Sequence, residues 1–140
     1  MDKTKLLKDI ANNEMLRFLG VNIDVAEADR VVLTMEVTTK AHQYLGIMNG
    51  GISLFLAETA ASIGVVAGAD LTKVTPVGIE INANHLRAVS KGIITVEARP
   101  IYTGKAMSVW GINITNDRGK LVCTSRITLL HQKRAVYQPS

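Results

Sequence analysis

The chain has 140 residues, of which 47% are hydrophobic and only 4% aromatic, and its formal net charge is +4. This length favours one domain spanning residues 1–140. The basic excess is spread along the chain and suits a phosphorylated small ligand, whereas scarce aromatic side chains and the lack of zinc-finger spacing argue against a nucleic-acid partner. The histidines lie away from cysteine and acidic clusters, so we expect no metal site.

The N-terminal residues lack the uninterrupted apolar stretch of a signal peptide, and Cys123 is the only cysteine. Both features suit a reducing compartment, so we expect a cytoplasmic protein without an internal disulfide. Cys123 itself lies in an apolar, strand-like stretch, where we expect it to be a small buried residue.

Apolar residues recur at helical spacing from Leu6 to Phe18 and predict a helical segment over about residues 1–19, which stops at Gly20. Later stretches have the two-residue period or β-branched composition of strands, and the turns between them are rich in Gly, Asn and Asp. We expect a loop over residues 38–48, and strands over residues 21–25, 31–37, 77–83, 92–98, 107–115 and 121–130. Short connections favour antiparallel neighbours.

The stretch that follows Asn49 predicts a long helix that is apolar on nearly all sides. From Ile52 to Ala67 its clearly polar side chains are Ser53, Glu58, Thr59 and Ser62. Such a helix belongs in a core or an interface, and the polar residues argue against a membrane span. The sequence therefore predicts an α+β architecture in which a curved antiparallel sheet wraps one helix. The Glu58 carboxylate would cost several kcal/mol there unless it is paired, protonated or used.

The spacing of polar residues around this helix forms a first motif. Gln43 lies six residues before Asn49-Gly50-Gly51, Glu58 lies nine residues after Asn49, and the Ser62 hydroxyl follows one helical turn later. Free N–H groups and the positive dipole end at a helix N-terminus favour an oxyanion, and glycines there let a ligand approach the backbone. We therefore expect the Gly50 N–H to be the main oxyanion donor, supported by that of Gly51.

Two further blocks follow in the chain, over residues 78–87 and 100–105. In this order and spacing, from about residue 19 to residue 128, the sequence resembles the hotdog-fold acyl-CoA thioesterases. The resemblance is greatest to the branch that hydrolyses aromatic acyl-CoAs such as 4-hydroxybenzoyl-CoA and 1,4-dihydroxy-2-naphthoyl-CoA, and to phenylacetate-pathway thioesterases. It implies a hotdog fold and the release of a carboxylic acid and free coenzyme A from an aromatic or medium-chain acyl-CoA.

The resemblance also implies the site residues. Glu58 would be the nucleophile or the general base, and the sequence does not separate a mixed-anhydride route from activation of a water molecule. The other catalytic candidates are Gly50, Gln43, Ser62 and Asn49. The candidates for binding the substrate and its coenzyme A portion are Gly51, Gly78, His85, Leu86, Arg87, Ala88, Tyr102, Thr103, Gly104, Lys105, Ala106 and Met107. No separate cofactor is implied, because coenzyme A is part of the substrate.

Asn49 departs from the family, which usually has His at this position. In the resembling enzymes the carboxylate is the catalytic group and the His shapes the loop. Asn can cap a helix and donate hydrogen bonds, so we keep the predicted activity.

The distance between Gly50 and Glu58 predicts the assembly. Eight residues of helix span about 12 Å, whereas a reacting carbonyl group must lie about 3 Å from both the donor and the acid. The two groups must then come from different subunits, so we expect a homodimer with shared active sites. The resemblance implies that two such dimers pair into a tetramer.

Two alternative functions remain open. A hotdog dehydratase acting on hydroxyacyl thioesters would need a His paired with an acid, and a non-catalytic acyl-CoA-binding protein would explain the missing motif His. The residues that line an acyl pocket are also open, because apolar residues are usually core residues. The candidates are Met15, Met48, Phe55, Leu56 and Ile63.

Overall fold

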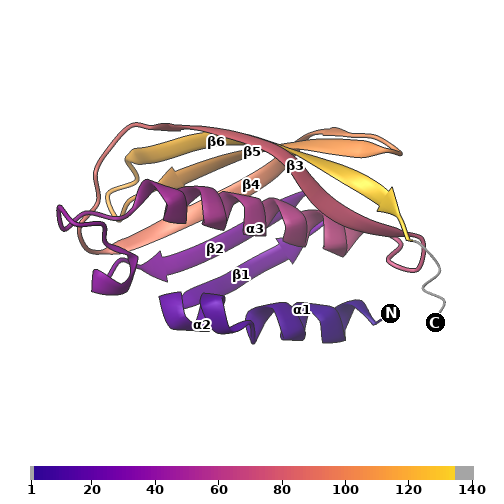
Figure 1. Cartoon of the computed structure of the whole chain (residues 1–140), viewed down its shortest axis with the longest axis horizontal. Helices are drawn as coiled ribbons and strands as arrows, with labels where there is room; N and C mark the ends of the chain where they lie inside the picture. Colours follow the sequence, from indigo (N-terminus) through magenta and orange to yellow (C-terminus); the bar gives the residue numbers. More distant parts are fainter. Residues whose placement is uncertain (1, 135–140) are drawn as a thin grey trace.

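The computed structural model describes residues 2–134, in which one curved sheet wraps a long helix (Figure 1). The helical elements are α1 (Lys3–Ala11), α2 (Glu14–Leu19), the 3₁₀ turn η1 (Thr39–Ala41) and α3 (Gly50–Gly68). The strands are β1 (Val21–Glu27), β2 (Arg30–Glu36), β3 (Val74–His85), β4 (Ile93–Thr103), β5 (Met107–Thr115) and β6 (Leu121–Lys133). The predicted α+β architecture is confirmed.

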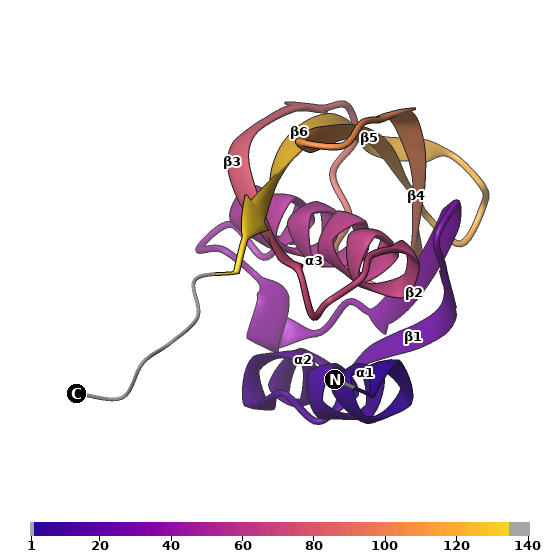
Figure 2. The ribbon, with the colours of Figure 1, turned by 90° about the vertical axis from the view of Figure 1, so that its right-hand side faces the viewer.

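The six strands form one sheet in the order β1-β2-β4-β5-β6-β3, and every neighbouring pair is antiparallel. The sheet arches over α3, while α1 and α2 lie on the side of α3 away from β5 and β6 (Figure 2). Every predicted strand is present, but β1, β3, β4 and β6 extend beyond their predicted ends, to Glu27, His85, Thr103 and Lys133. Among residues 2–134, the strand β3 is an edge strand that pairs only with β6.

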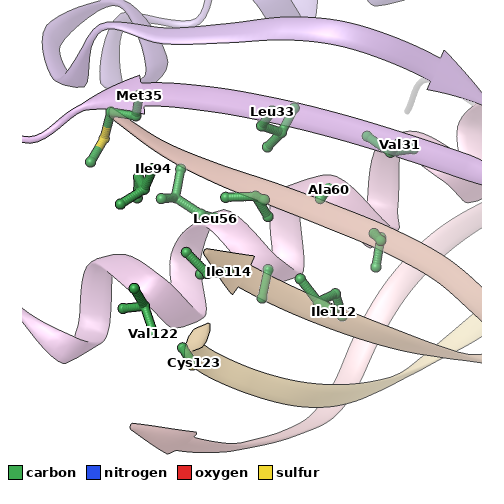
Figure 3. Packing of buried hydrophobic residues seen from close by; sticks show 14 of the residues in the cluster. Val31, Leu33, Met35, Leu56, Ala60, Ile94, Ile112, Ile114, Val122 and Cys123 are labelled. Carbon is green, nitrogen blue, oxygen red and sulfur yellow. The ribbon is translucent and has the colours of Figure 1, made fainter. Parts of the chain in front are cut away.

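The core lies between α3 and the concave face of the sheet (Figure 3). Leu56 and Ala60 of α3 are fully buried, and they face apolar side chains such as Leu33 and Ile112. Half of α3 is buried, although its length and hydropathy would also suit a membrane span. Its apolar composition therefore serves to fill the wrapped sheet. Cys123 belongs to the same core, as predicted, and burial raises the pKa of its thiol.

Close approach between α3 and β5 depends on Gly64. A Cβ atom added there would lie 2.2 Å from the Trp110 ring, which is itself 2% exposed. We expect Gly64→Ala to lower the free energy of unfolding by about 1–3 kcal/mol, the usual cost of overpacking, as measured by urea denaturation. At an open helical position the same exchange stabilises by up to about 1 kcal/mol. A stabilised variant would thus contradict the contact.

A double-mutant cycle with Trp110→Phe tests the same contact. The indole Nε1 of Trp110 is buried without a hydrogen-bond partner among the described residues, so the smaller ring sacrifices no hydrogen bond. We expect Gly64→Ala to cost less in the Trp110→Phe background, because the ring atoms nearest to Gly64 are gone. If the losses of unfolding free energy in the two single variants simply added up in the double variant, the strain caused by Gly64→Ala would not come from the Trp110 ring.

The N-terminal segment is helical as predicted, but it forms two helices. The break falls at Asn12 and Asn13, where the Asn13 Oδ1 accepts hydrogen bonds from the N–H groups of Met15 at 3.1 Å and Leu16 at 3.4 Å. An asparagine that caps a new helix competes with continuation of the old one. The predicted stop at Gly20 is confirmed, because this residue adopts a left-handed conformation with φ of 74°.

Candidate active site

The N-terminus of α3 is shaped by Asn49. Its side-chain Oδ1 accepts a hydrogen bond from the Gly51 N–H at 2.8 Å, and its own N–H donates to the Ala41 carbonyl at 2.8 Å. The predicted capping role of Asn49 is confirmed. Because the cap engages the Gly51 N–H, this group is not free to support an oxyanion, contrary to our expectation. Gly50 then supplies the remaining candidate N–H.

The imidazole of His85 lies directly over Gly50. A Cβ atom added to Gly50 would lie 3.0 Å from both Cε1 and Nε2 of His85. His85 ends β3, so the fold brings a histidine to the helix N-terminus although Asn49 occupies the motif position. A glycine at position 50 is needed for this close approach.

Gly50 and His85 open into a cavity of about 430 Å³. Besides these two residues, its lining includes Gln43, Ser53, Leu86, Arg87 and Ala88. The fold therefore brings the first motif and the second block together here, although Gly50 and His85 are 35 residues apart in the sequence. The chain is held in place because the N–H groups of Leu86 and Arg87 donate to the Val122 carbonyl at 2.8 and 3.2 Å.

Gln43 is oriented by its own loop. Its Oε1 accepts a hydrogen bond from the Leu45 N–H, and its N–H donates to the Ile47 carbonyl at 2.8 Å. With Oε1 engaged, the side-chain amide has its Nε2 donors left for a ligand. Gln43 can therefore contribute donors to the cavity that contains Gly50.

Glu58 is exposed in the single chain, so it does not lie in the core, and its place in an interface between subunits stays a prediction. The sheet covers only part of α3, and Glu58 lies at the edge of the covered part, beside the edge strand β3. The carboxylate lies against Gly78 of this strand, where an added Cβ atom would be 2.5 Å from Oε1. The register of β3 shifts between Gly78 and Glu80, and such bulges are frequent beside active sites.

A second hollow of about 310 Å³ contains Glu58 on its wall. Ser62 and Thr59 line it with Glu58, which places the predicted hydroxyl beside the carboxylate. Of the candidates for an acyl pocket, Phe55 and Ile63 also line this hollow. The others do not: Leu56 is a buried core residue, Met15 is exposed on α2, and Met48 lines the cavity at Gly50.

The last of the three sequence blocks, over residues 100–105, lies at the other end of α3. Thr103, Gly104 and Lys105 belong to the β4–β5 hairpin and line a separate cavity of about 340 Å³ beside Gly64 and Gly68. The hairpin is closed by the Gly104 N–H, which donates to the Met107 carbonyl at 2.9 Å, and the Ala106 carbonyl accepts from the His131 N–H at 2.8 Å. Tyr102 folds over Gly104. Within one chain, this block does not meet the cavity at Gly50.

Several residues that line these hollows were not among the predicted candidates, and Ser53, Thr59 and Ile10 are three of them. Ser53 lies one turn after Gly50 and is 1% exposed, Thr59 adjoins Glu58, and Ile10 of α1 packs across the hollow that contains Glu58. Helical spacing from Gly50 could have indicated Ser53, and helical spacing from Ser62 could have indicated Thr59. No local pattern indicates Ile10, because its contact joins distant parts of the chain.

The site is therefore divided within one chain. The candidate donor at Gly50 and the candidate acid Glu58 line different hollows, in keeping with their separation of about 12 Å along one helix. Among residues 2–134, no cluster of three or more His, Cys, Asp or Glu side chains could hold a metal ion. The geometry offers an oxyanion site and a carboxylate, which are the groups that acyl transfer requires.

The fold and these groups are those of a known enzyme class. The sequence pattern of the Thioesterase superfamily matches residues 45–123, more than half of the chain. The chain belongs to this superfamily and is a thioester hydrolase with the hotdog fold.

Individual relatives are similar over most of their length. The chain is 41% identical over 116 residues to 1,4-dihydroxy-2-naphthoyl-CoA hydrolase of Listeria monocytogenes, covering 83% of this chain and 94% of that protein. It is 36% identical over 124 residues to the Escherichia coli protein of the same name, covering 87% and 89%. A mutant thioesterase from Pseudomonas aeruginosa superposes with a TM-score of 0.86 at 30% identity, covering 96% of each chain.

Proposed function

We propose that the chain is an acyl-CoA thioesterase whose active site combines Gly50 of one subunit with Glu58 of another. The observation that carries this proposal is the division of the site: each chain presents an oxyanion donor in one hollow and a carboxylate in another. Two antiparallel copies of α3 around a twofold axis would bring both halves together twice.

The proposed reaction cleaves the thioester C–S bond with water. The Gly50 N–H donates to the carbonyl oxygen as negative charge develops on it, and the α3 dipole adds to this stabilisation. Glu58 either takes a proton from the attacking water or attacks the carbonyl carbon itself, after which water hydrolyses the anhydride. Gln43 and Ser62 orient the water and the carboxylate. The products are a carboxylic acid and the coenzyme A thiol.

The edge strand β3 suits a dimer interface. It is 12 residues long, its outer edge has no partner strand among residues 2–134, and Ile79 is 56% exposed on it. Such an edge readily pairs with another strand. Pairing β3 with its copy would also cover the adjacent face of α3, where Glu58 lies. We expect sedimentation to show a dimer or larger, and an active monomer would contradict the shared site.

A second contact between dimers would complete the proposed tetramer. Val77, Leu130 and Met107 are directly paired across β3, β6 and β5, so their side chains share one face of the sheet. Leu129 is fully buried towards α3, so this face points away from the helix. The exposed apolar row is the surface that we propose for pairing of dimers.

The coenzyme A portion carries phosphates that need cationic partners. Arg87 lines the cavity at Gly50, together with His85, Leu86 and Ala88. The Lys105 hairpin is far from this cavity in its own chain, so we propose that it serves a site shared with another subunit. The acyl group is aromatic or medium-chain, and the name 1,4-dihydroxy-2-naphthoyl-CoA hydrolase of two relatives supports the aromatic choice.

Thiol release from benzoyl-CoA, hexanoyl-CoA and palmitoyl-CoA tests the function. We expect release from the first two at rates well above that from palmitoyl-CoA. Hydration of a crotonyl thioester without thiol release would support a dehydratase instead. Tight acyl-CoA binding with no turnover of any substrate would indicate a non-catalytic binding protein.

A further inference from the structure

The hollow that contains Glu58 adjoins a second hollow, which is lined by residues of α1. This neighbouring hollow of about 410 Å³ shares three lining residues with it, namely Ile10, Phe55 and Thr59. The two hollows therefore adjoin at these three side chains, between α1 and α3. We call the pair of hollows the α1 groove.

Helix α1 covers this groove without filling it. None of its residues is fully buried, and only Leu7 and Ile10 pack partly against the core. The helix is also tied to the end of α3, because the Lys3 Nζ donates to the Ala67 carbonyl at 3.0 Å. Figure 2 shows α1 running beside α3 on the side away from the sheet. Space therefore remains between the two helices.

The chemistry of the α1 groove changes along its length. Beside Glu58 and farther in, the walls are apolar side chains such as Phe55, Ile63 and Ile10. Asp9 and Asn13, both exposed, lie in the lining of the outer hollow. A ligand suited to this lining has a reactive polar group at Glu58 and an apolar tail that ends before the polar outer end.

We propose that the α1 groove receives a linear acyl chain and that Ile10 and Thr59 determine how long this chain can be. The inference rests on the thioesterase function proposed above. The thioester lies at Glu58, and the chain runs past Thr59 beneath α1 towards Asn13. The preferred substrates are then medium-length, straight-chain acyl-CoAs, and an aryl group occupies only the inner hollow.

A chain-length series tests this proposal. We expect kcat/KM for butanoyl-, hexanoyl-, octanoyl- and decanoyl-CoA to rise about fourfold per buried methylene in the wild type. Thr59→Phe adds bulk where the two hollows meet. We expect it to lower the ratio of kcat/KM for decanoyl-CoA to that for butanoyl-CoA by about tenfold or more, the equivalent of two unburied methylenes.

A second pair of variants changes α1, which forms the opposite wall of the α1 groove. Ile10→Trp narrows the α1 groove from α1, whereas Lys8→Trp adds the same ring on an exposed position of the same helix. We expect Ile10→Trp to lower the decanoyl-to-butanoyl ratio and Lys8→Trp to leave it unchanged. An unchanged ratio in both Thr59→Phe and Ile10→Trp would overturn the proposal.

Binding separates this inference from the proposed function. Non-hydrolysable S-alkyl-CoA thioethers of the same lengths can be titrated calorimetrically into the wild type and Thr59→Phe. A dissociation constant that falls with chain length only in the wild type supports the α1 groove, even if no substrate releases thiol and the proposed function fails. Affinity that is independent of length in both proteins refutes the groove, whatever the catalytic result.

Discussion

Replacing Glu58 by Gln is expected to lower kcat for thiol release by about 10²- to 10⁴-fold, the usual contribution of a positioned acid or base. The amide keeps nearly the same size beside Gly78 and lacks both the nucleophilic oxygen and the capacity to take a proton. Glu58 is exposed in the single chain, so the exchange buries no new polar group and the fold should persist. Thiol release from benzoyl-CoA and hexanoyl-CoA, followed with a thiol reagent, measures the loss.

A matched exchange controls for charge. Glu36→Gln removes one carboxylate from an exposed position at the end of β2, away from both hollows that form the divided site. It should retain wild-type kcat and the same unfolding midpoint. If Glu58→Gln also kept most of its activity, Glu58 would be neither the nucleophile nor the general base.

The fold could be predicted largely because its elements have strong local patterns. Alternation from Val77 to Ala83 marks a strand, and the apolar stretch after Asn49 marks the core helix. The alternation does not reveal the register shift between Gly78 and Glu80, which leaves Val77 and Ile79 exposed while Ile81 and Ala83 pack against the core. The ends of the strands were harder to predict, because β3 and β4 extend beyond their alternating parts through pairing with neighbouring strands. The break at Asn13 depends on a cap whose energy, about 1 kcal/mol, is comparable to that of one more helical turn.

The site was predictable where helical spacing or a motif determined it. Asn49, Gly50 and Glu58 lie where the motif requires, and Ser62 lines the hollow beside Glu58. The exposure of Glu58 was not predictable from composition, because an apolar helix suits a core and an interface equally well. The meeting of His85 with Gly50 required the path of β3, which no local pattern encodes.

Mixing two inactive chains provides the sharpest test of the divided site. Gly50→Ala places a Cβ atom 3.0 Å from the His85 ring and crowds the oxyanion position, so this variant and Glu58→Gln should each be nearly inactive as homodimers. Co-expressed in equal amounts, they should recover about a quarter of wild-type activity. Half of random dimers are mixed, and each mixed dimer has one intact site of two.

A second co-expression, with both substitutions on one chain, shows whether the recovered activity comes from sites shared between subunits. When both are placed on one chain and co-expressed with wild type, every mixed dimer loses one half of each site. Only the wild-type homodimers, about a quarter of the total, should then keep both sites intact. A site contained within one chain predicts the opposite pattern: two single variants never complement, and the double variant with wild type retains about half of the activity. The two arrangements thus give different activities in both mixtures, and one pair of co-expressions distinguishes them.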